Sequence, residues 1–202
     1  MAKEAYPFLI PVALLAFLFF EFGLPIWSGL FLALGIFVAC FFRDPERSVP
    51  VDVEAIVSPA DGKVVRVSTG IDGMTEISIF LSVFNVHINR SPIGGRIESI
   101  CHRPGKFRVA FDERASVENE QNVWTVQNGS RQVKFSQIAG ILARRIVSWK
   151  RTGDRVEKGE RVGLIKFGSR VDIFLPTEVI ATVRVGDKVK GGSSIIGRFN
   201  HA

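Results

Sequence analysis

A histidine in a polar setting is the first candidate for acid–base chemistry in this 202-residue chain. His87 follows the strand-like run 80–83 and has polar neighbours, which is unusual for a core histidine. Imidazole changes charge near neutral pH, so this side chain could donate or accept a proton. His102 lies at a strand end or turn, and His201 lies next to the C-terminus, where we expect it to be solvated.

The second candidate is a Gly-Ser step, Gly168-Ser169, between an apolar run and a strand-like run. Taken alone, such a step is typical of a turn. A glycine before a serine nevertheless exposes its carbonyl and tolerates strained dihedral angles, which would suit attack by the neighbouring hydroxyl.

The motifs of the common hydrolases and metalloenzymes are absent from the sequence, which contains no H-E-x-x-H, C-x-x-C, P-loop or G-x-S-x-G pattern. The two cysteines, Cys40 and Cys101, have neither the number nor the spacing of a disulfide framework or a metal site. We therefore predict no metal. No aromatic and basic reading surface is present, so we predict no nucleic-acid partner.

The N-terminal part, residues 1–42, is almost free of charge and contains two apolar runs, 5–20 and 24–42. A membrane-spanning helix needs about 20 apolar residues; the second run meets this length, and the first is shorter and contains two prolines. Basic residues at both ends favour the cytoplasm. We therefore predict a membrane anchor, as two spans or a re-entrant helical hairpin. The alternative is a buried hairpin of a soluble protein.

The remaining residues, 43–202, contain 25 basic and 18 acidic side chains, as expected for a domain on the cytoplasmic side of an anionic membrane. Short runs rich in Val, Ile and Phe alternate with turn residues, which indicates strands. We expect them at 63–68, 76–83, 123–127, 132–137, 171–175 and 180–185. The run 138–147 is ambiguous between helix and strand, and we favour a strand bent at Gly140.

An internal repeat, G-D-x-V-x-x-G, occurs at 153–159 and again at 186–192. Glycines at both ends supply turn conformations that other residues avoid. We predict a mainly β fold, a compact β-sandwich or barrel-like catalytic domain with paired hairpin repeats, preceded by the apolar helical anchor.

Three motifs occur here in the order and spacing of the phosphatidylserine decarboxylase family: S-P-A-D-G at 58–62, F-L-S at 80–82 followed by His87, and F-G-S at 167–169. From about residue 43 to residue 199, the chain resembles the short form of this family.

The resemblance implies that the chain cleaves itself between Gly168 and Ser169. The serine hydroxyl would attack the preceding carbonyl, and elimination from the resulting ester followed by hydrolysis would leave a covalent pyruvoyl group, the cofactor. The products would be a large chain, 1–168, with its catalytic part at 43–168, and a small chain, 169–202. These would form a heterodimer, with or without further oligomerisation.

The resemblance also implies the chemistry. The pyruvoyl group would form a Schiff base with phosphatidylserine and accept electrons as carbon dioxide leaves, which gives phosphatidylethanolamine. His87 matches the histidine that returns a proton, and Asp61 matches the aspartate associated with processing. Long-form members carry a second histidine where this chain has Arg90, and Ser169 is followed here by Arg170. The processing base is therefore open.

Three cations flank the motifs, namely Lys63, Arg90 and Arg170, and could bind the phosphate or carboxylate of a phospholipid. For each of them the alternative is a solvated surface charge. The step Gly192-Ser193 is an alternative cleavage site. It belongs to the second repeat, and cleavage there would release too few residues to build a strand pair, so we prefer Ser169.

Two other functions stay open at this point. One is decarboxylation of archaetidylserine, an ether lipid with the same headgroup. The other is a non-catalytic, membrane-tethered β module of the carrier or scaffold type, in which the Gly-Ser step is only a turn. For the enzyme we expect the cell membrane, with the catalytic domain on the cytoplasmic side.

Overall fold

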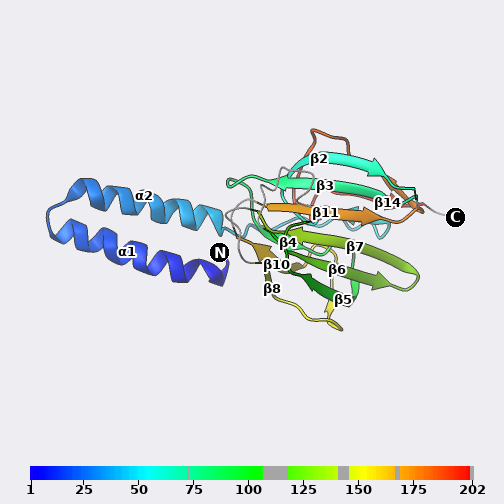
Figure 1. The fold of residues 1–202 in the computed structure, drawn as a ribbon, viewed down its shortest axis with the longest axis horizontal. Coiled ribbons are helices and arrows are strands. Elements are labelled where there is room, and N and C mark those ends of the chain that lie inside the picture. Colours follow the sequence, from blue (N-terminus) through cyan, green and yellow to red (C-terminus); the bar gives the residue numbers. More distant parts are fainter. Residues whose placement is uncertain (72, 107–117, 141–145, 167–168, 201–202) are drawn as a thin grey trace. The chain divides into compact units, whose positions relative to one another are not determined.

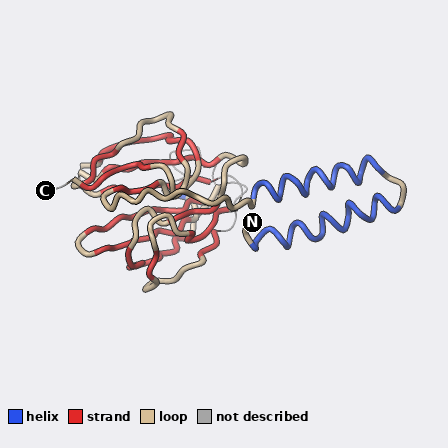
Figure 2. Tube along the Cα trace, turned by 180° about the vertical axis from the view of Figure 1, so that it is seen from behind, coloured by secondary structure: helices blue, strands red, loops and turns tan. Residues whose placement is uncertain are grey.

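The computed structural model describes residues 1–71, 73–106, 118–140, 146–166 and 169–200. The chain divides into two compact units, residues 1–46 and residues 47–202. The first is helical and the second consists of strands and loops (Figures 1 and 2).

The first unit is a hairpin of two helices. A 3-10 turn, Lys3–Ala5, runs into α1, Tyr6–Glu21, and α2 covers Pro25–Phe41. The continuous stretch Lys3–Glu21 has the length and composition to cross a membrane, whereas α2 is shorter. We predicted the reverse, and that was wrong. The first stretch is longer because the 3-10 turn Lys3–Ala5 continues into α1, and Pro7 is accommodated in the first turn of α1, where the backbone N–H needs no acceptor.

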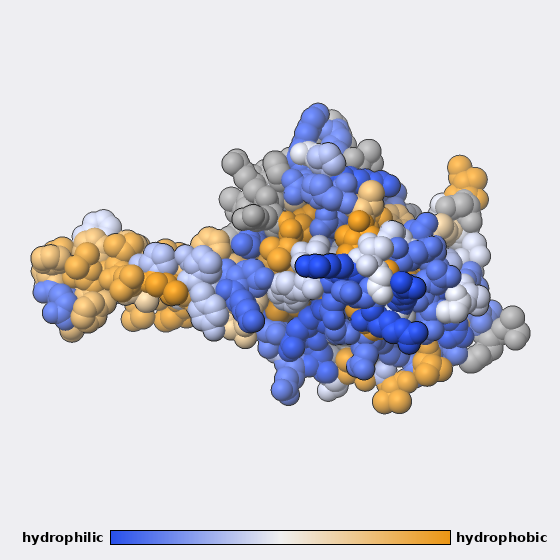
Figure 3. All heavy atoms as spheres, turned by 90° about the horizontal axis from the view of Figure 1, so that it is seen from below, coloured by the Kyte–Doolittle hydropathy of each residue, from blue (hydrophilic) through white to orange (hydrophobic). Residues whose placement is uncertain are grey.

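The two helices pack against each other and still expose most of their apolar side chains. The ring centroids of Phe19 and Phe31 stack 5.4 Å apart, and Ser28 Oγ donates a hydrogen bond to Ala16 O at 2.8 Å. Large apolar side chains cover the outside of the hairpin, as the orange spheres of Figure 3 show. An exposed apolar surface of this extent is typical of a segment that contacts lipid or another protein.

The described part of the second unit contains fourteen strands. They are β1 (Ala55–Val57), β2 (Gly62–Thr69), β3 (Thr75–Leu81), β4 (Ile88–Arg90), β5 (Gly95–Arg103), β6 (Gln121–Asn128), β7 (Arg131–Ile138), β8 (Ile146–Ser148), β9 (Arg155–Val156), β10 (Arg161–Ile165), β11 (Ser169–Leu175), β12 (Val179–Ala181), β13 (Lys188–Val189) and β14 (Ile195–Phe199).

These strands form one large and two small antiparallel sheets. The large sheet has the order β13-β2-β3-β11-β7-β6-β5-β9, and the small sheets have the orders β1-β14-β12 and β4-β10-β8. The central strands β3, β11, β7 and β6 lie side by side in Figure 1. The prediction of a mainly β fold is confirmed.

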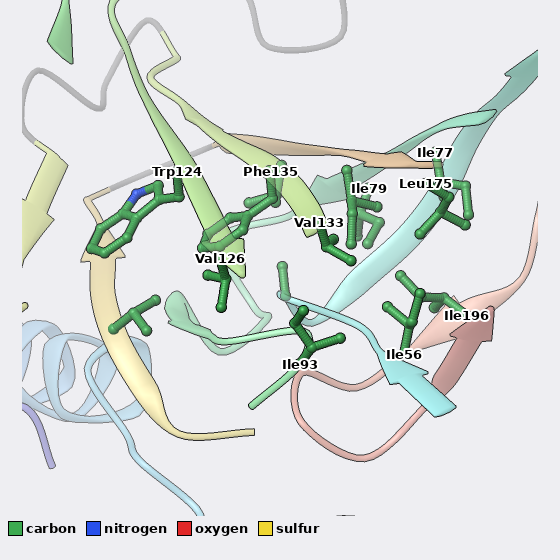
Figure 4. Close-up of a cluster of buried hydrophobic side chains, with 14 of the residues drawn as sticks. Ile56, Ile77, Ile79, Ile93, Trp124, Val126, Val133, Phe135, Leu175 and Ile196 are labelled. Atoms are coloured by element: carbon green, nitrogen blue, oxygen red, sulfur yellow. The ribbon is translucent and has the colours of Figure 1, made fainter. Parts of the chain in front are cut away.

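The hydrophobic core lies between the large sheet and the small sheets. One face of the large sheet contributes Trp124, Phe135 and Ile77, which are fully buried. Figure 4 shows these side chains in one cluster with Ile56 of β1 and Ile196 of β14. The period of two in β3, β7 and β11 thus turns one set of side chains toward a shared core.

The two G-D-x-V-x-x-G repeats have the same local structure. In each, the aspartate carboxylate accepts a hydrogen bond from the backbone N–H three residues earlier, at 2.8 Å for both Asp154 and Asp187. Each turn leads into a two-residue strand, β9 or β13. These strands are the two outermost strands of the large sheet, so one motif terminates both edges.

The ends of the two repeats meet at Gly159 and Gly192. Both residues have positive φ angles, 77° and 78°, and a Cβ added to either would lie 3.4 Å from the carbonyl oxygen of the other. The turns that follow the two edge strands of the large sheet, β9 and β13, therefore lie against each other.

Two of our strand assignments need correction. The run 138–147 is not one bent strand, because β7 ends at Ile138 in the large sheet and β8 begins at Ile146 in a small one, with 141–145 outside the described residues. The strand expected at 180–185 is only Val179–Ala181. The longest strand, β5, was missed because most of its side chains are exposed, which hides the apolar alternation.

Candidate active site

Ser169 is the first residue of β11, which lies between β3 and β7 in the large sheet. It pairs with Leu81 at the end of β3, and its side chain lies on the core face with Val171 and Ile173. Ser169 is fully buried, and among the described residues its Oγ has no hydrogen-bond partner. A buried hydroxyl without a partner costs about 1–3 kcal/mol, so stability does not explain a serine here. Gly168 lies outside the described residues.

The topology brings His87 to the same end of the fold. Strands β3 and β11 pair in the large sheet, and their chain neighbours β4 and β10 pair in a small sheet. The chain therefore passes twice between the same two sheets, once before His87 and once before Ser169. The backbone confirms this proximity, because Ile165 N donates to His87 O at 3.2 Å, four residues ahead of Ser169.

The His87 ring is held inside the protein, with the residue only 2% exposed. Its Nδ1 lies 3.0 Å from the backbone carbonyl oxygen of Asn85. A carbonyl oxygen can only accept a hydrogen bond, so Nδ1 carries the hydrogen in this contact. Nε2 is then the nitrogen that gains or loses a proton.

The Asp61 carboxylate lies in an ion pair that the sequence analysis did not foresee. Arg47 Nη2 donates to Asp61 Oδ1 at 3.0 Å and to Oδ2 at 2.7 Å, and Gly191 N donates to Oδ1 at 2.8 Å. Asp61 immediately precedes β2, and β3 separates β2 from β11. Ordinary strand spacing gives about 10 Å between the backbones of β2 and β11. Asp61 therefore lies near Ser169, but this spacing is too large for direct contact.

We predict that Arg47→Ala destabilises the protein and slows self-cleavage. Both side chains of the pair are about one-tenth exposed, and removal of one partner leaves a nearly buried charge, which costs about 3 kcal/mol. Denaturant unfolding of Ser169→Ala protein, with and without the Arg47 change, measures this cost, and the fraction of two-chain product measures cleavage. Arg66→Ala is the matched control, because the Arg66–Glu76 pair spans 3.9 Å and Arg66 is 42% exposed. Equal free energies of unfolding for the two variants would contradict a stabilising role of the Arg47–Asp61 ion pair.

The structure places Arg170 on the face of β11 opposite to Ser169, where it is almost fully buried. Its Nε donates to Asp172 Oδ1 at 2.6 Å, and its Nη2 donates to Ser78 Oγ at 2.6 Å. The first bond lies within β11, and the second ties β11 to β3. The predicted contact of Arg170 with substrate stays a prediction, and its bonds show a role in anchoring the strand.

Arg90 and Lys63 lie in different surroundings. Arg90 is buried at the junction of the two repeats, and its Nη1 donates to Gly159 O at 3.0 Å. Lys63 is exposed and lies directly opposite Lys188 across β2 and β13. Like charges opposite each other are destabilising, so this pair of lysines favours an anion nearby. Of the three predicted substrate-binding cations, only Lys63 has an exposed side chain.

A buried polar chain, which the sequence analysis missed, joins the sheets beside His87. Trp124 Nε1 donates to Gln137 Oε1 at 2.7 Å, and Gln137 Nε2 donates to Asn89 Oδ1 at 2.8 Å. Asn89 Nδ2 in turn reaches Pro59 O at 3.5 Å, in the S-P-A-D-G turn. All of these side chains are fully buried. The alternation along β7 predicts that Gln137 lies on the core face with Phe135, and this pattern is the one sequence signal for the buried polar chain.

A cavity of about 810 Å³ lies elsewhere. Its walls include Gly95 of β5 and Gln127 of β6. Gln121, at the other end of β6, shares a row of the sheet with Arg170. Six residues of strand separate the two ends by about 20 Å, so this cavity is remote from Ser169 and His87.

Comparison with known proteins identifies the family. The model of the phosphatidylserine decarboxylase family matches residues 34–197. The chain belongs to the phosphatidylserine decarboxylase family. Proteins named phosphatidylserine decarboxylase proenzyme are similar to this family member almost end to end. The one from Desulfotalea psychrophila is 42% identical over 98% of this chain and 96% of its own, and the one from Geotalea uraniireducens is 45% identical over 98% and 95%. The one from Solibacter usitatus is 50% identical over 86% and 84%.

Proposed function

We propose that this protein decarboxylates phosphatidylserine to phosphatidylethanolamine, using a pyruvoyl group made from its own Ser169. One observation carries the proposal, namely the fully buried Ser169 Oγ without a described hydrogen-bond partner, at the start of a central strand in a chain of this family. Its named relatives are proenzymes, which is consistent with a chain that must be processed.

Self-processing would begin at the peptide bond between Gly168 and Ser169. Ser169 Oγ attacks the Gly168 carbonyl carbon, the C–N bond breaks, and the acyl group moves from nitrogen to oxygen. Loss of the Ser169 α-proton to a base then expels the Gly168 carboxylate and leaves dehydroalanine. Water hydrolyses its imine tautomer, releases ammonia and leaves the ketone of the pyruvoyl group.

Strand pairing would hold the small chain, 169–202, after cleavage. Its strand β11 forms seven register pairs with β3, from Ser169 to Leu175, and five with β7. Its other strands pair across the molecule, since β13 lies beside β2 and β14 lies beside β1. A cut before Ser169 therefore leaves a central strand in place, as a two-chain enzyme requires.

The site fits a pyruvoyl group, because loss of the Ser169 hydroxyl removes no described hydrogen bond. When formed, this group supplies a ketone that condenses with the substrate amine and accepts electrons as carbon dioxide leaves. The protein supplies the rest. His87 Nε2 returns a proton to the α-carbon, the core face of β11 excludes water, and Lys63 attracts the lipid phosphate.

Residues 1–42 would anchor the enzyme in the membrane that contains its substrate. The stretch Lys3–Glu21 is long and apolar enough to cross a bilayer, and α2 packs beside it as a hairpin. Lys3 at one end and Arg43 and Arg47 at the other favour a cytoplasmic location for both ends. We therefore propose that the catalytic unit, 43–202, works on the cytoplasmic side.

Release of labelled carbon dioxide from phosphatidylserine vesicles tests the proposal. Purified protein is expected to release the carboxyl label from phosphatidylserine. It should leave free serine unchanged, because free serine has neither the phosphate nor the acyl chains that bring the lipid to the membrane-anchored site. Absence of release by fully cleaved protein would refute it. Activity on an ether-linked phosphatidylserine analogue alone would assign the archaetidylserine alternative instead, and an intact, inactive chain would favour the non-catalytic β module.

A further inference from the structure

The side chain of Asn85 closes the turn that precedes His87. Its Oδ1 accepts two hydrogen bonds from Ser82, one from N at 2.9 Å and one from Oγ at 2.7 Å. Asn85 N donates back to Ser82 O at 2.9 Å. Three hydrogen bonds between the same two residues fix the direction of the next peptide group, which carries the Asn85 carbonyl.

That carbonyl is the group that holds the His87 ring. The distance from Nδ1 to Asn85 O is 3.0 Å, and the backbone carbonyl of His87 is itself bound by Ile165 N at 3.2 Å. The histidine backbone is thus fixed by the strand that leads to Ser169, and the histidine ring is fixed by the turn. The ring orientation depends on both.

We propose that Asn85 is a positioning residue that selects the tautomer of His87. Through the turn, it aims a carbonyl oxygen at Nδ1, so that Nδ1 carries the hydrogen and Nε2 exchanges the proton. This inference rests on the proposed function only for what Nε2 does in the reaction. The choice of tautomer is a property of the folded chain, before any cleavage.

The physical reason lies in the number of bonds that one side chain makes. Asn85→Ala removes the acceptor of two of the three turn bonds. The carbonyl of residue 85 is then no longer held in a fixed direction. Without an acceptor aimed at Nδ1, the hydrogen of the His87 ring is no longer favoured on Nδ1. In the alternative tautomer the neutral ring would keep its hydrogen on Nε2, so Nδ1 rather than Nε2 would exchange the proton, and a wrong tautomer is a known cause of lost acid–base catalysis.

The direct test measures the tautomer by ¹⁵N chemical shifts of labelled histidine in uncut Ser169→Ala protein. His87 is expected in the Nδ1–H form, and Asn85→Ala is expected to convert it to a mixture or to the Nε2–H form. Asn85→Asp keeps an acceptor oxygen and should keep the Nδ1–H form. Val83→Ala, in the same turn but outside these hydrogen bonds, is the matched control and should leave the tautomer unchanged.

Kinetics of the self-cleaving protein give a second readout. Asn85→Ala should still form two chains, with kcat for decarboxylation lowered at least about tenfold and KM changed less than about twofold, because ring orientation affects the proton transfer and not lipid binding. Ser82→Ala removes only the Oγ donor and should have a smaller effect on kcat. If Asn85→Ala does not fold, Ser82→Ala carries the test.

The two readouts separate this inference from the proposed function. An unchanged Nδ1–H tautomer in Asn85→Ala, or a kcat equal to that of the parent, would overturn the positioning role. A tautomer change as expected, together with no decarboxylation by the cleaved parent protein, would support the positioning role and refute the proposed function.

Discussion

Ser169→Ala is expected to yield a single uncut chain of 22.4 kDa with decarboxylation at background level, whereas the parent protein yields two chains. Alanine keeps the strand position and removes only Oγ, the atom that attacks the Gly168 carbonyl. Because this hydroxyl is buried without a described partner, its removal leaves no other group unsatisfied and should not lower the free energy of unfolding. Intact-mass spectrometry of purified protein measures the outcome.

Ser193→Ala is the matched control for the cleavage site. Ser193 follows Gly192 in the second repeat, a tight turn with a positive φ angle, and this variant should cleave and decarboxylate as the parent does. In the parent, the small chain should begin at residue 169 with an N-terminus blocked to sequencing, because its terminal group is a ketone. A small chain that begins at residue 193, or an active uncut chain, would refute the assignment.

His87→Ala is expected to cleave normally and to lose carbon dioxide release by about 10²–10⁴-fold, the usual contribution of a positioned acid or base. The ring is 2% exposed and its Nδ1 is held by Asn85 O, so it is oriented in advance for proton transfer through Nε2. Initial rates on phosphatidylserine vesicles, normalised to the amount of cleaved protein, separate loss of chemistry from loss of processing.

His102→Ala provides the comparison for that experiment. His102 lies on β5, is exposed and contacts Asn122 Oδ1 through Nδ1 at 2.8 Å. Its replacement should change neither cleavage nor decarboxylation. A His87→Ala chain that stays uncut would reassign His87 to self-cleavage, which would also supply the processing base that Arg90 cannot provide.

The candidate site residues could be proposed from the sequence because their motifs are local. The S-P-A-D-G turn, the histidine after F-L-S and the Gly-Ser step each occupy a few consecutive residues. These motifs and their order along the chain could therefore be recognised in the sequence. The apolar patterning along β3, β7 and β11 is equally local, and it correctly predicted strands there. Where most side chains were exposed, as along β5, the same reasoning failed.

The amino-acid sequence by itself determined the apolar hairpin, the β-rich second unit, the repeated turn and the chemical identity of Ser169, His87 and Asp61. The tertiary structure alone decided which group each of them meets: Arg47 pairs with Asp61, and the neighbour of Ser169 on β3 is Leu81. It also decided that the two repeats lie at opposite edges of one sheet. The physical reason is that such pairings depend on strand order, and strand order is set by burial of the whole core rather than by any short segment.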